Sequence, residues 1–247
     1  MTAATFSVAQ VVVLAAAVLF SALVTAVAGF GFGLMSVPLM SLVVDLHSAV
    51  IVSSFVGAVG NVVQVRLYRK ARDRALANRL TIASILGLPF GYAVYATVSD
   101  TALRVVLFAG VLVAVAVLAR GVNLTHVGPG MDWVLGFTSG VLNSSISTSG
   151  PPLVFDLQSR KLEPDRFRGT INFVFLVSGA LGLAIYAIGG KVHRNELVAA
   201  AVAVPALFAG LGLGLPLRKH FPAERFRVLV LVLLLVSAFA AVAKAFV

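Results

Sequence analysis

Long apolar runs separated by short polar connectors make up nearly the whole chain. Most of them approach or reach the roughly 20 residues with which a helix crosses a hydrocarbon core about 30 Å thick. The long runs are residues 9–28, 48–65, 80–98, 102–119, 170–189, 197–217 and 228–243, and shorter or interrupted runs are 32–44, 133–146 and 151–158. This pattern predicts an all-α polytopic membrane protein.

The composition agrees with a membrane location. Hydrophobic residues make up 60% of the chain and the mean hydropathy is +1.05, whereas soluble domains contain roughly 45–50% apolar residues. Residues 1–28 have no basic segment ahead of an apolar stretch that is long for a signal peptide. We therefore expect this stretch to remain as a membrane helix, with its N-terminus outside.

The formal net charge of +10 does not indicate nucleic-acid binding, because the Lys and Arg residues are spread over short connectors rather than gathered on one soluble face. The chain contains no cysteine, which excludes disulfides and thiolate metal sites. Its four histidines are widely separated and form no helical ligand pair. We expect no metal site, no other cofactor and no nucleic-acid partner.

Two polar breaks interrupt the apolar pattern at matching places. GlyPheGlyPheGly occupies residues 29–33, and SerThrSerGlyProPro occupies residues 147–152, about 118 positions later. Lipid cannot hydrogen-bond an unwound backbone, so such a break is tolerated only where it is buried in protein or lines a cavity. Paired breaks are typical of the substrate sites of transporters.

Further matches between the two halves occur at an offset of 123. Arg104 aligns with Arg227. Gly87 and Gly91 align with Gly210 and Gly214, each pair being spaced for close helix packing. The sequence therefore predicts a duplicated unit, with residues 1–125 as the first transmembrane repeat and 126–247 as the second.

The basic residues orient this unit in the membrane. The connector 66–79 carries six basic residues against one acidic residue, so we expect it to be cytoplasmic. By alternation, the connectors around 120–130, 159–168 and 217–227 are cytoplasmic too, and both chain ends are outside. Each half then has five helical elements, an odd number, which predicts inverted repeats. Eight to ten spans are expected, depending on whether the broken helices cross or re-enter.

The break residues suit a site for a small oxyanion. Thr148 or Ser149 can cap a helix with Pro151 in its first turn, and the backbone NH groups of a helix start attract anions. In the first half, Gly29, Gly31 and Gly33 allow close backbone approach, with Ser36 as a hydroxyl donor. The alternative is that these glycines and prolines only permit tight packing and kinks.

At these residues the chain resembles the TauE/SafE family of sulfite exporters. The resemblance is carried by GlyPheGlyPheGlyLeuMetSerValPro at 29–38, SerGlyProProLeu at 149–153 and PheArgGlyThr at 167–170. It implies a membrane permease for sulfite, sulfonates or related sulfur-containing anions, coupled in some members to an ion gradient. Phe30 and Phe32 stand where relatives often have a more glycine-rich run, and SerGlyProPro replaces a common GlyGlyGlyPro. These departures from the family pattern leave the identity of the substrate open.

Polar residues near the second break complete the candidate site. Arg168 can pair with an anion or can serve as a cytoplasmic anchor at the interface, and Thr170 and Asn172 follow it on the same span. Asp156 is a candidate for ion coupling or a mouth residue paired with a neighbouring cation. The predicted substrate-binding residues are Gly29, Gly31, Gly33, Ser36, Thr148, Ser149, Gly150, Pro151, Arg168, Thr170 and Asn172.

Three functions remain to be weighed. A secondary transporter that carries an anion across the inner membrane by alternating access fits the inverted repeats. Its coupling ion would be a proton or a sodium ion. The sequence leaves open whether the protein is a homodimer. A passive anion channel could use the same helix ends. A membrane-embedded enzyme would need a nucleophile and base or a ligand cluster, and the sequence offers neither.

Overall fold

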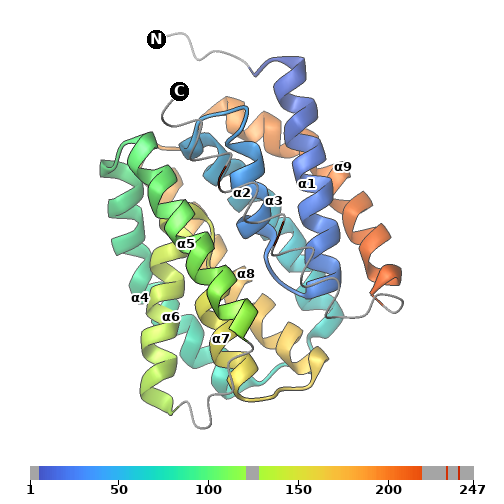
Figure 1. Cartoon of the computed structure of the whole chain (residues 1–247), viewed down its shortest axis with the longest axis vertical. Helices are drawn as coiled ribbons and strands as arrows, with labels where there is room; N and C mark the ends of the chain where they lie inside the picture. The colour runs from blue at the N-terminus through green and yellow to red at the C-terminus, as the bar shows by residue number, and fades with distance from the viewer. Residues whose placement is uncertain (1–5, 121–127, 219–231, 233–238, 240–247) are drawn as a thin grey trace.

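The computed structural model describes residues 6–120 and 128–218, together with Val232 and Phe239. Every regular element in this part of the chain is an α-helix (Figure 1), as the sequence predicts. The helices are α1 (Val8–Ala28), α2 (Phe32–Met40), α3 (Leu46–Tyr68), α4 (Arg74–Thr97), α5 (Asp100–Arg120), α6 (Pro129–Ile146), α7 (Gly150–Ser159), α8 (Pro164–Ile188) and α9 (Arg194–Leu217). Arg227 and both chain ends lie outside the described residues.

The helices fall into two length classes. In the part of the chain that the structure describes, α1, α3, α4, α8 and α9 are long and apolar enough to cross a membrane. α2 and α7 have only 9 and 10 residues. At a rise of 1.5 Å per residue each extends about 15 Å, roughly half of the hydrocarbon core. These lengths favour the re-entrant alternative over complete crossings for both broken segments.

Local sequence signals account for most helix starts. Ser7 and Gln10 form a reciprocal capping box at the start of α1. Asp45 and Asp73 cap α3 and α4 through hydrogen bonds to backbone amides three residues later. α6, α7 and α8 each carry a proline in the first turn, where its missing NH leaves no helical bond unmade.

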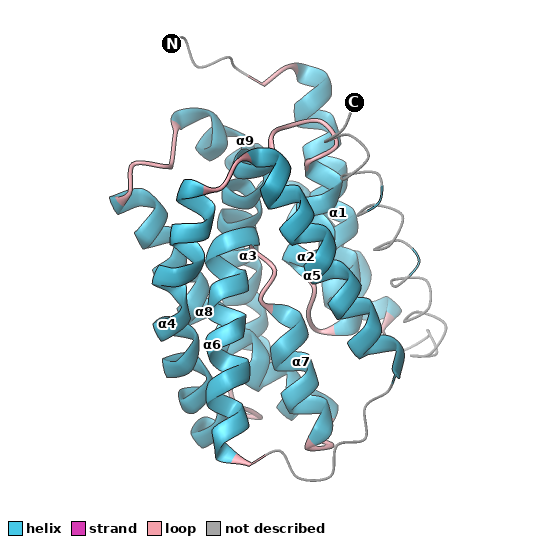
Figure 2. Cartoon of the chain, turned by 60° about the vertical axis from the view of Figure 1, so that its left-hand side comes forward, coloured by secondary structure: helices cyan, strands magenta, loops and turns pink. Residues whose placement is uncertain are grey.

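Two helical hairpins open toward opposite ends of the bundle (Figure 2). In the α1–α2 hairpin, the Gln10 side chain near the start of α1 donates to Val43 O, just beyond α2, at 2.9 Å. In the α6–α7 hairpin, Asp132 in the first turn of α6 pairs with Arg160 at the end of α7. Each half-length helix therefore turns back toward the end of the bundle at which its hairpin began.

The two breaks match in position at an offset of 118. α1 ends with Gly29 in the left-handed region at φ 88°, and α6 ends with Ser147 in the same region at φ 54°. The left-handed end of the first helix is therefore kept even where a glycine is absent from the second half. The residues before the half-length helices differ, with φ 97° at Gly31 before α2 and φ -82° at Ser149 before α7.

The aligned glycines make equivalent contacts in the two halves. A Cβ at Gly87 of α4 would lie 2.2 Å from Phe137 O in α6, and a Cβ at Gly210 of α9 would lie 2.3 Å from Leu19 O in α1. Leu19 and Phe137 are again 118 positions apart. Each half therefore packs the glycine face of its long helix on the first helix of the other half.

α3 and α8, which correspond at the offset of 118, run in opposite directions. The start of α8 lies against the end of α3, where a Cβ at Gly169 would be 2.7 Å from Tyr68 O. The start of α3 lies against the start of α9, where Ser48 donates to Glu196 at 2.9 Å. The larger buried apolar cluster draws mainly on α1, α2, α3, α5 and α9, and a smaller one joins α4, α7 and α8.

Basic residues gather at one end of the bundle, which we call the basic end. It is formed by the α3–α4 and α7–α8 connectors (Figure 2), and Arg218, which follows α9, reaches it through the Tyr68 hydroxyl. Arg166 and Asp73 join the two connectors at 2.6 Å. Burial alone would raise the pKa of Asp73, but hydrogen bonds from the Leu76 amide and the Arg166 guanidinium outweigh it and lower that pKa. The basic residues at the basic end include Arg66, Arg69, Lys70, Arg72, Arg74, Arg79, Arg160, Lys161, Arg166, Arg168 and Arg218.

The glycine contacts predict a specific pattern of stability. Gly91→Ala places a methyl group 2.1 Å from Val141 O, and Gly214→Ala places one 2.8 Å from Leu23 O. Both variants should lose stability, by about 1–3 kcal/mol or more, because the helices must move apart. Gly212→Ala meets nothing within 4 Å and is the matched control. Thermal unfolding in one detergent compares them, and a Gly91→Ala variant as stable as Gly212→Ala would contradict the packing.

Candidate functional site

A cavity of about 60 Å³ lies where the two breaks meet α3 and α8. None of the described residues that line it carries a charge; most of its polar groups are hydroxyls and side-chain amides. The lining consists of Thr25, Phe30, Gly31, Phe32, Gly33, Leu34, Ser53, Ser54, Gly57, Ala58, Asn61, Asn143, Ser147, Ser149, Gly150, Asn172, Phe175 and Gly179. The cavity thus contains five of the predicted site residues: Gly31, Gly33, Ser149, Gly150 and Asn172.

The two breaks touch each other beside this cavity. A Cβ at Gly33 would lie 1.8 Å from Ser147 O, so only glycine allows this approach. On the other side of the break, a Cβ at Gly150 would meet Phe30 Cδ2 at 3.6 Å, an ordinary contact. Gly33 is therefore needed for packing, whereas Gly150 faces space that a small side chain could enter.

The two helix starts offer different numbers of backbone donors. α2 begins at Phe32, so the amides of Phe32, Gly33 and Leu34 belong to the first turn, whose NH groups have no acceptor within the helix. α7 begins at Gly150, followed by Pro151 and Pro152, which have no NH. The second break therefore depends more on side-chain donors than the first.

The expected hydroxyl cap of α7 is not formed. Ser149 occupies the N-cap position, as predicted, but its side chain makes no capping hydrogen bond. Thr148 is buried, and its hydroxyl donates to Ile146 O at 3.0 Å, on the preceding helix. Prolines at the second and third helical positions, Pro151 and Pro152, remove both of the NH groups that such a cap would bind, which explains the difference. Ser149 lines the cavity, and its hydroxyl is not used for capping.

A chain of serine hydroxyls links the cavity wall to the interior. Ser36 and Ser53 are 2.7 Å apart, and Ser147 lies 3.5 Å from Ser53. Ser54 reaches Ser147 at 3.1 Å. The predicted donor Ser36 is fully buried and does not line the cavity. Its hydroxyl is hydrogen-bonded to that of Ser53, which lines the cavity.

The cavity lining is largely paired at the offset of 118. The pairs are Thr25 with Asn143, Gly31 with Ser149, Phe32 with Gly150, Ser54 with Asn172, Gly57 with Phe175, and Asn61 with Gly179. Size is exchanged within several pairs. A Cβ at Gly57 would lie 3.2 Å from Phe32, and one at Gly150 would lie 4.0 Å from Phe175. Each half therefore supplies one phenylalanine–glycine contact, with the two partners in swapped positions.

Asn172 ties the first break to α8. Its Nδ2 donates to Gly29 O at 3.1 Å and to Arg168 O at 2.8 Å. Because both partners are carbonyl oxygens, they fix the orientation of the amide. Gly29 itself does not line the cavity; its Cα side faces Arg168, whose Cγ would be 2.8 Å from an added Cβ.

Four other predicted residues also lie outside the cavity wall. Thr148 and Pro151 are buried within the second break. Thr170 is fully buried, and its hydroxyl accepts from the Asp73 amide at 3.1 Å. Arg168 contacts Asp165 at 3.3 Å rather than the cavity. Whether any of these residues binds substrate stays a prediction, but their contacts give each a structural role.

Asp156 belongs to a buried ionic cluster at the basic end. It pairs with Arg160 at 3.3 Å, which is the partner expected for a residue at the mouth. Arg160 also binds Asp132, and Arg79 lies 3.0 Å from the other oxygen of Asp132. This cluster joins α4, α6 and α7 by their ends. A role of Asp156 in ion coupling stays a prediction.

The sequence reasoning missed several lining residues. Ser53, Ser54, Gly57 and Asn61 follow one face of α3 at spacings of three or four residues. Small and polar residues at helical spacing within an apolar span are a signal that can be read from sequence. The structure places Asn61 in the cavity wall.

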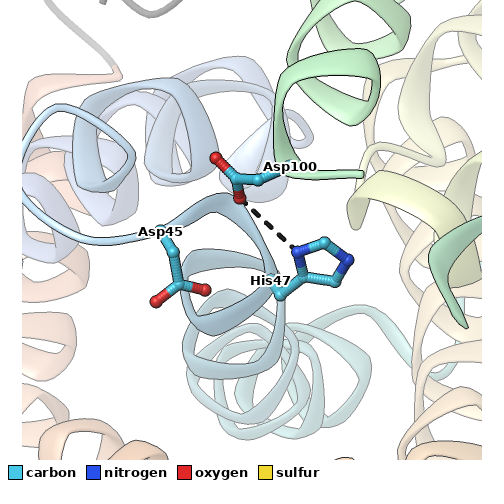
Figure 3. A group of neighbouring side chains, drawn as sticks. All are labelled: Asp45, His47 and Asp100. Atoms are coloured by element: carbon cyan, nitrogen blue, oxygen red, sulfur yellow. Dashed lines mark ion pairs between the residues drawn. The ribbon is translucent and has the colours of Figure 1, made fainter. Parts of the chain in front are cut away.

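A second polar cluster lies at the opposite end of the bundle (Figure 3). The ligand atoms of Asp45, His47 and Asp100 lie within 4.8 Å of one another. Existing contacts already use these groups: Asp100 accepts from the Leu46 amide at 2.6 Å and pairs with Arg104 at 2.8 Å, and His47 Nε2 is 3.0 Å from Tyr95 O. The cluster therefore joins the starts of α3 and α5 to the end of α4, and we assign it a structural role.

Comparison with known proteins agrees with the helical architecture and the break motifs. The family model for the sulfite exporter TauE/SafE matches residues 14–241. The chain is 32% identical over 99 residues to the probable inner membrane transporter protein TsaS of Comamonas testosteroni, covering 40% of this chain and 41% of that protein. It is 30% identical over 95 residues to the probable sulfite/organosulfonate exporter TauE of Cupriavidus necator, covering 38% and 36%.

The matches to individual relatives cover only part of the chain, whereas the family model covers most of it. The aligned segments span about two fifths of the curated relatives' lengths, and no solved structure matches the chain. The family match covers most of the chain, including both breaks. The chain therefore belongs to the TauE/SafE sulfite exporter family.

Proposed function

We propose that this protein is a secondary transporter for a small sulfur-containing anion, sulfite or a sulfonate, and that the cavity between α2 and α7 binds it. The observation that carries the proposal is the donor set of that cavity: two helix starts, serine hydroxyls and side-chain amides, without a carboxylate among its described residues. Helix starts favour negative charge, and their NH groups point at a bound oxyanion. The name of one relative refers to sulfite and organosulfonates.

The neutral lining suits a carried ligand rather than a permanently held one. A buried cation would bind an oxyanion through charge-assisted hydrogen bonds, which are roughly twice as strong as neutral ones. Neutral donors such as the Ser149 hydroxyl offer weaker bonds that can be broken on release. The small cavity volume, about 60 Å³, favours sulfite or the head group of a short sulfonate.

We further propose that the halves are inverted repeats related by a pseudo-two-fold axis in the membrane plane. Support comes from the equivalent contacts of Gly87 and Gly210 and from the opposed directions of α3 and α8. The paired lining residues then lie on both sides of this axis. One half could rock against the other around the fixed site, which is the geometry of alternating access.

The orientation that we propose puts the basic end in the cytoplasm, because basic connectors are retained on that side. Arg104 is a basic residue at the opposite end, and its contacts explain this exception. Its guanidinium donates to Ser41 O at 2.9 Å and pairs with Asp100. It thereby caps the end of α2, where a cation is favoured. This contact accounts for the position of Arg104 at the end opposite the basic end.

Filling the cavity should abolish binding without unfolding the protein. Gly150→Val keeps its Cβ at ordinary contact distances from Phe30 and Phe175 and projects two methyl groups toward the cavity. Sulfite binding, measured by calorimetry on purified protein, should be lost. Gly212→Val, at a position with nothing within 4 Å, is the control and should bind normally. Wild-type affinity in a folded Gly150→Val protein would move the site elsewhere.

Removing one hydroxyl should have a milder effect. Ser149→Ala deletes a side-chain donor that the helix does not use for capping. Sulfite affinity should fall by about 0.5–1.5 kcal/mol, the value of one neutral hydrogen bond. Flux into proteoliposomes should remain saturable, with a raised KM. Flux that rises linearly with sulfite concentration in wild type would favour a passive channel instead.

The orientation can be read by thiol labelling, since the native chain has no cysteine. Ala71→Cys lies in the connector at the basic end, and Lys191→Cys lies in the α8–α9 connector at the opposite end. In intact cells, an impermeant thiol reagent added outside should label Lys191→Cys and leave Ala71→Cys unlabelled until the cells are opened. Labelling of Ala71→Cys alone in intact cells would invert the topology.

A further inference from the structure

Two arginines from different helices flank one tyrosine ring at the basic end. The guanidinium carbon of Arg168 in α8 lies 6.0 Å from the ring centre of Tyr68, and that of Arg218 after α9 lies 5.8 Å from it. Arg218 also donates a hydrogen bond to the Tyr68 hydroxyl. The end of α3 thus holds two cations beside one tyrosine side chain.

The carboxylates around these two cations do not balance them. Arg168 pairs with Asp165, whose side chain is 61% exposed, at 3.3 Å. Its Nε is buried and has no hydrogen-bond partner among the described residues. Within the same part of the chain, no carboxylate pairs with Arg218. A buried guanidinium donor without an acceptor is costly, and an anion between the two arginines would satisfy it.

The hydroxyl of Tyr68 adds a third donor to this arrangement. It accepts from Arg218, which leaves its own proton available for donation. The side chain of Tyr68 is largely buried, so its position is fixed by packing. Guanidinium groups with a hydroxyl between them form the donor set that recognises the oxygens of sulfite, phosphate or sulfate.

The arrangement lies next to the first break but outside the cavity. Arg168 runs along Gly29, with its Nε 3.1 Å from the place where a Cβ would be. Neither arginine nor Tyr68 lines the cavity between α2 and α7. An anion held here would be separated from that cavity by Gly29 and the side chain of Asn172.

We propose that Arg168, Arg218 and Tyr68 form a second oxyanion-binding site at the basic end, distinct from the cavity between the breaks. Its ligand is an oxyanion with at least two free oxygens, supplied either by a free solute such as sulfite or by the phosphate of an anionic lipid. A free solute held here is concentrated beside the first break, whereas a lipid phosphate holds the end of α9 against α3. The site exists independently of what the cavity carries.

Fluorine NMR on the full-length protein tests this site directly. The chain has four tyrosines, so 3-fluorotyrosine labelling gives few signals, and Tyr68→Phe identifies the one from Tyr68. In phosphatidylcholine nanodiscs, titration with sulfite should shift the Tyr68 signal in a saturable way. Arg218→Gln should weaken that response about tenfold or more, because it removes charge-assisted hydrogen bonds.

Matched variants separate the site from general effects of charge and folding. Arg69→Gln removes one positive charge from an exposed position at the same end and should leave the Tyr68 response within about twofold of wild type. Arg218→Lys keeps the charge, and it should respond better than Arg218→Gln. If Arg218→Gln unfolds early, the comparison of Arg218→Lys with wild type still tests the requirement for a guanidinium.

Lipid composition distinguishes the two sources of the oxyanion. If the ligand is a lipid phosphate, nanodiscs containing phosphatidylglycerol should shift the Tyr68 signal without sulfite and block its titration. If it is a free solute, sulfite should act equally in both lipids. A Tyr68 signal that responds to neither, or that responds equally in Arg218→Gln, would overturn the proposal.

The same signal separates this site from the proposed transport function. Gly150→Val should abolish binding in the cavity and leave the Tyr68 titration intact. Loss of both responses in Gly150→Val, with the protein still folded, would show that the two sites are one. An intact Tyr68 response beside normal transport in Gly150→Val would reject the cavity assignment and retain the second site.

Discussion

The contact between Gly33 and the Ser147 carbonyl is the constraint on which the rest of the site depends. Both residues lie where a membrane helix has been interrupted, and the freed backbone groups cannot be left to lipid. Bringing the two breaks against each other buries them in protein. The approach requires glycine, because an added Cβ would sit 1.8 Å from the carbonyl oxygen. The cavity is the space that remains around this contact.

Close helix packing holds the two breaks in place. The glycines of α4 lie on α6, and those of α9 lie on α1. A long helix of each half therefore packs closely against the hairpin of the other half. Charged groups fasten the ends: Arg104 caps α2 at one end of the bundle, and Arg160 joins α7 to α6 at the other. The half-length helices are thereby fixed at their outer ends while their starts face the cavity.

Much of this arrangement could be predicted from sequence, because glycine and proline mark backbone constraints. The two breaks and the glycine pairs at 87, 91, 210 and 214 were found by their spacing alone, and their contacts agree with that reading. The hydroxyl cap of α7 was not correctly predicted, since Pro151 and Pro152 remove both amides that Ser149 would bind. The alignment of Arg104 with Arg227 lies outside the described residues.

The directions of side chains were harder to predict than the backbone. Sequence spacing placed Arg168, Thr170 and Asn172 together on one span, yet only Asn172 reaches the cavity wall. A helix turns about 100° per residue, so Thr170 faces a different side of α8 from Asn172. Arg168 lies one turn before Asn172, and its side chain runs along Gly29 instead of entering the cavity wall. Serines in the middle of α3 carried no motif, and their role depends on a contact with Ser147 that joins residues 93 positions apart. Such long-range pairings are set by tertiary packing.

Locating a bound oxyanion tests the central claim most directly. Selenite has the shape and charge of sulfite, and selenium scatters anomalously, so crystals grown with selenite report its position. The account predicts an anomalous peak in the cavity between the starts of α2 and α7, within hydrogen-bond distance of Ser149, and its absence in Gly150→Val. A cavity without a peak, in protein that transports selenite in competition with sulfite, would contradict it.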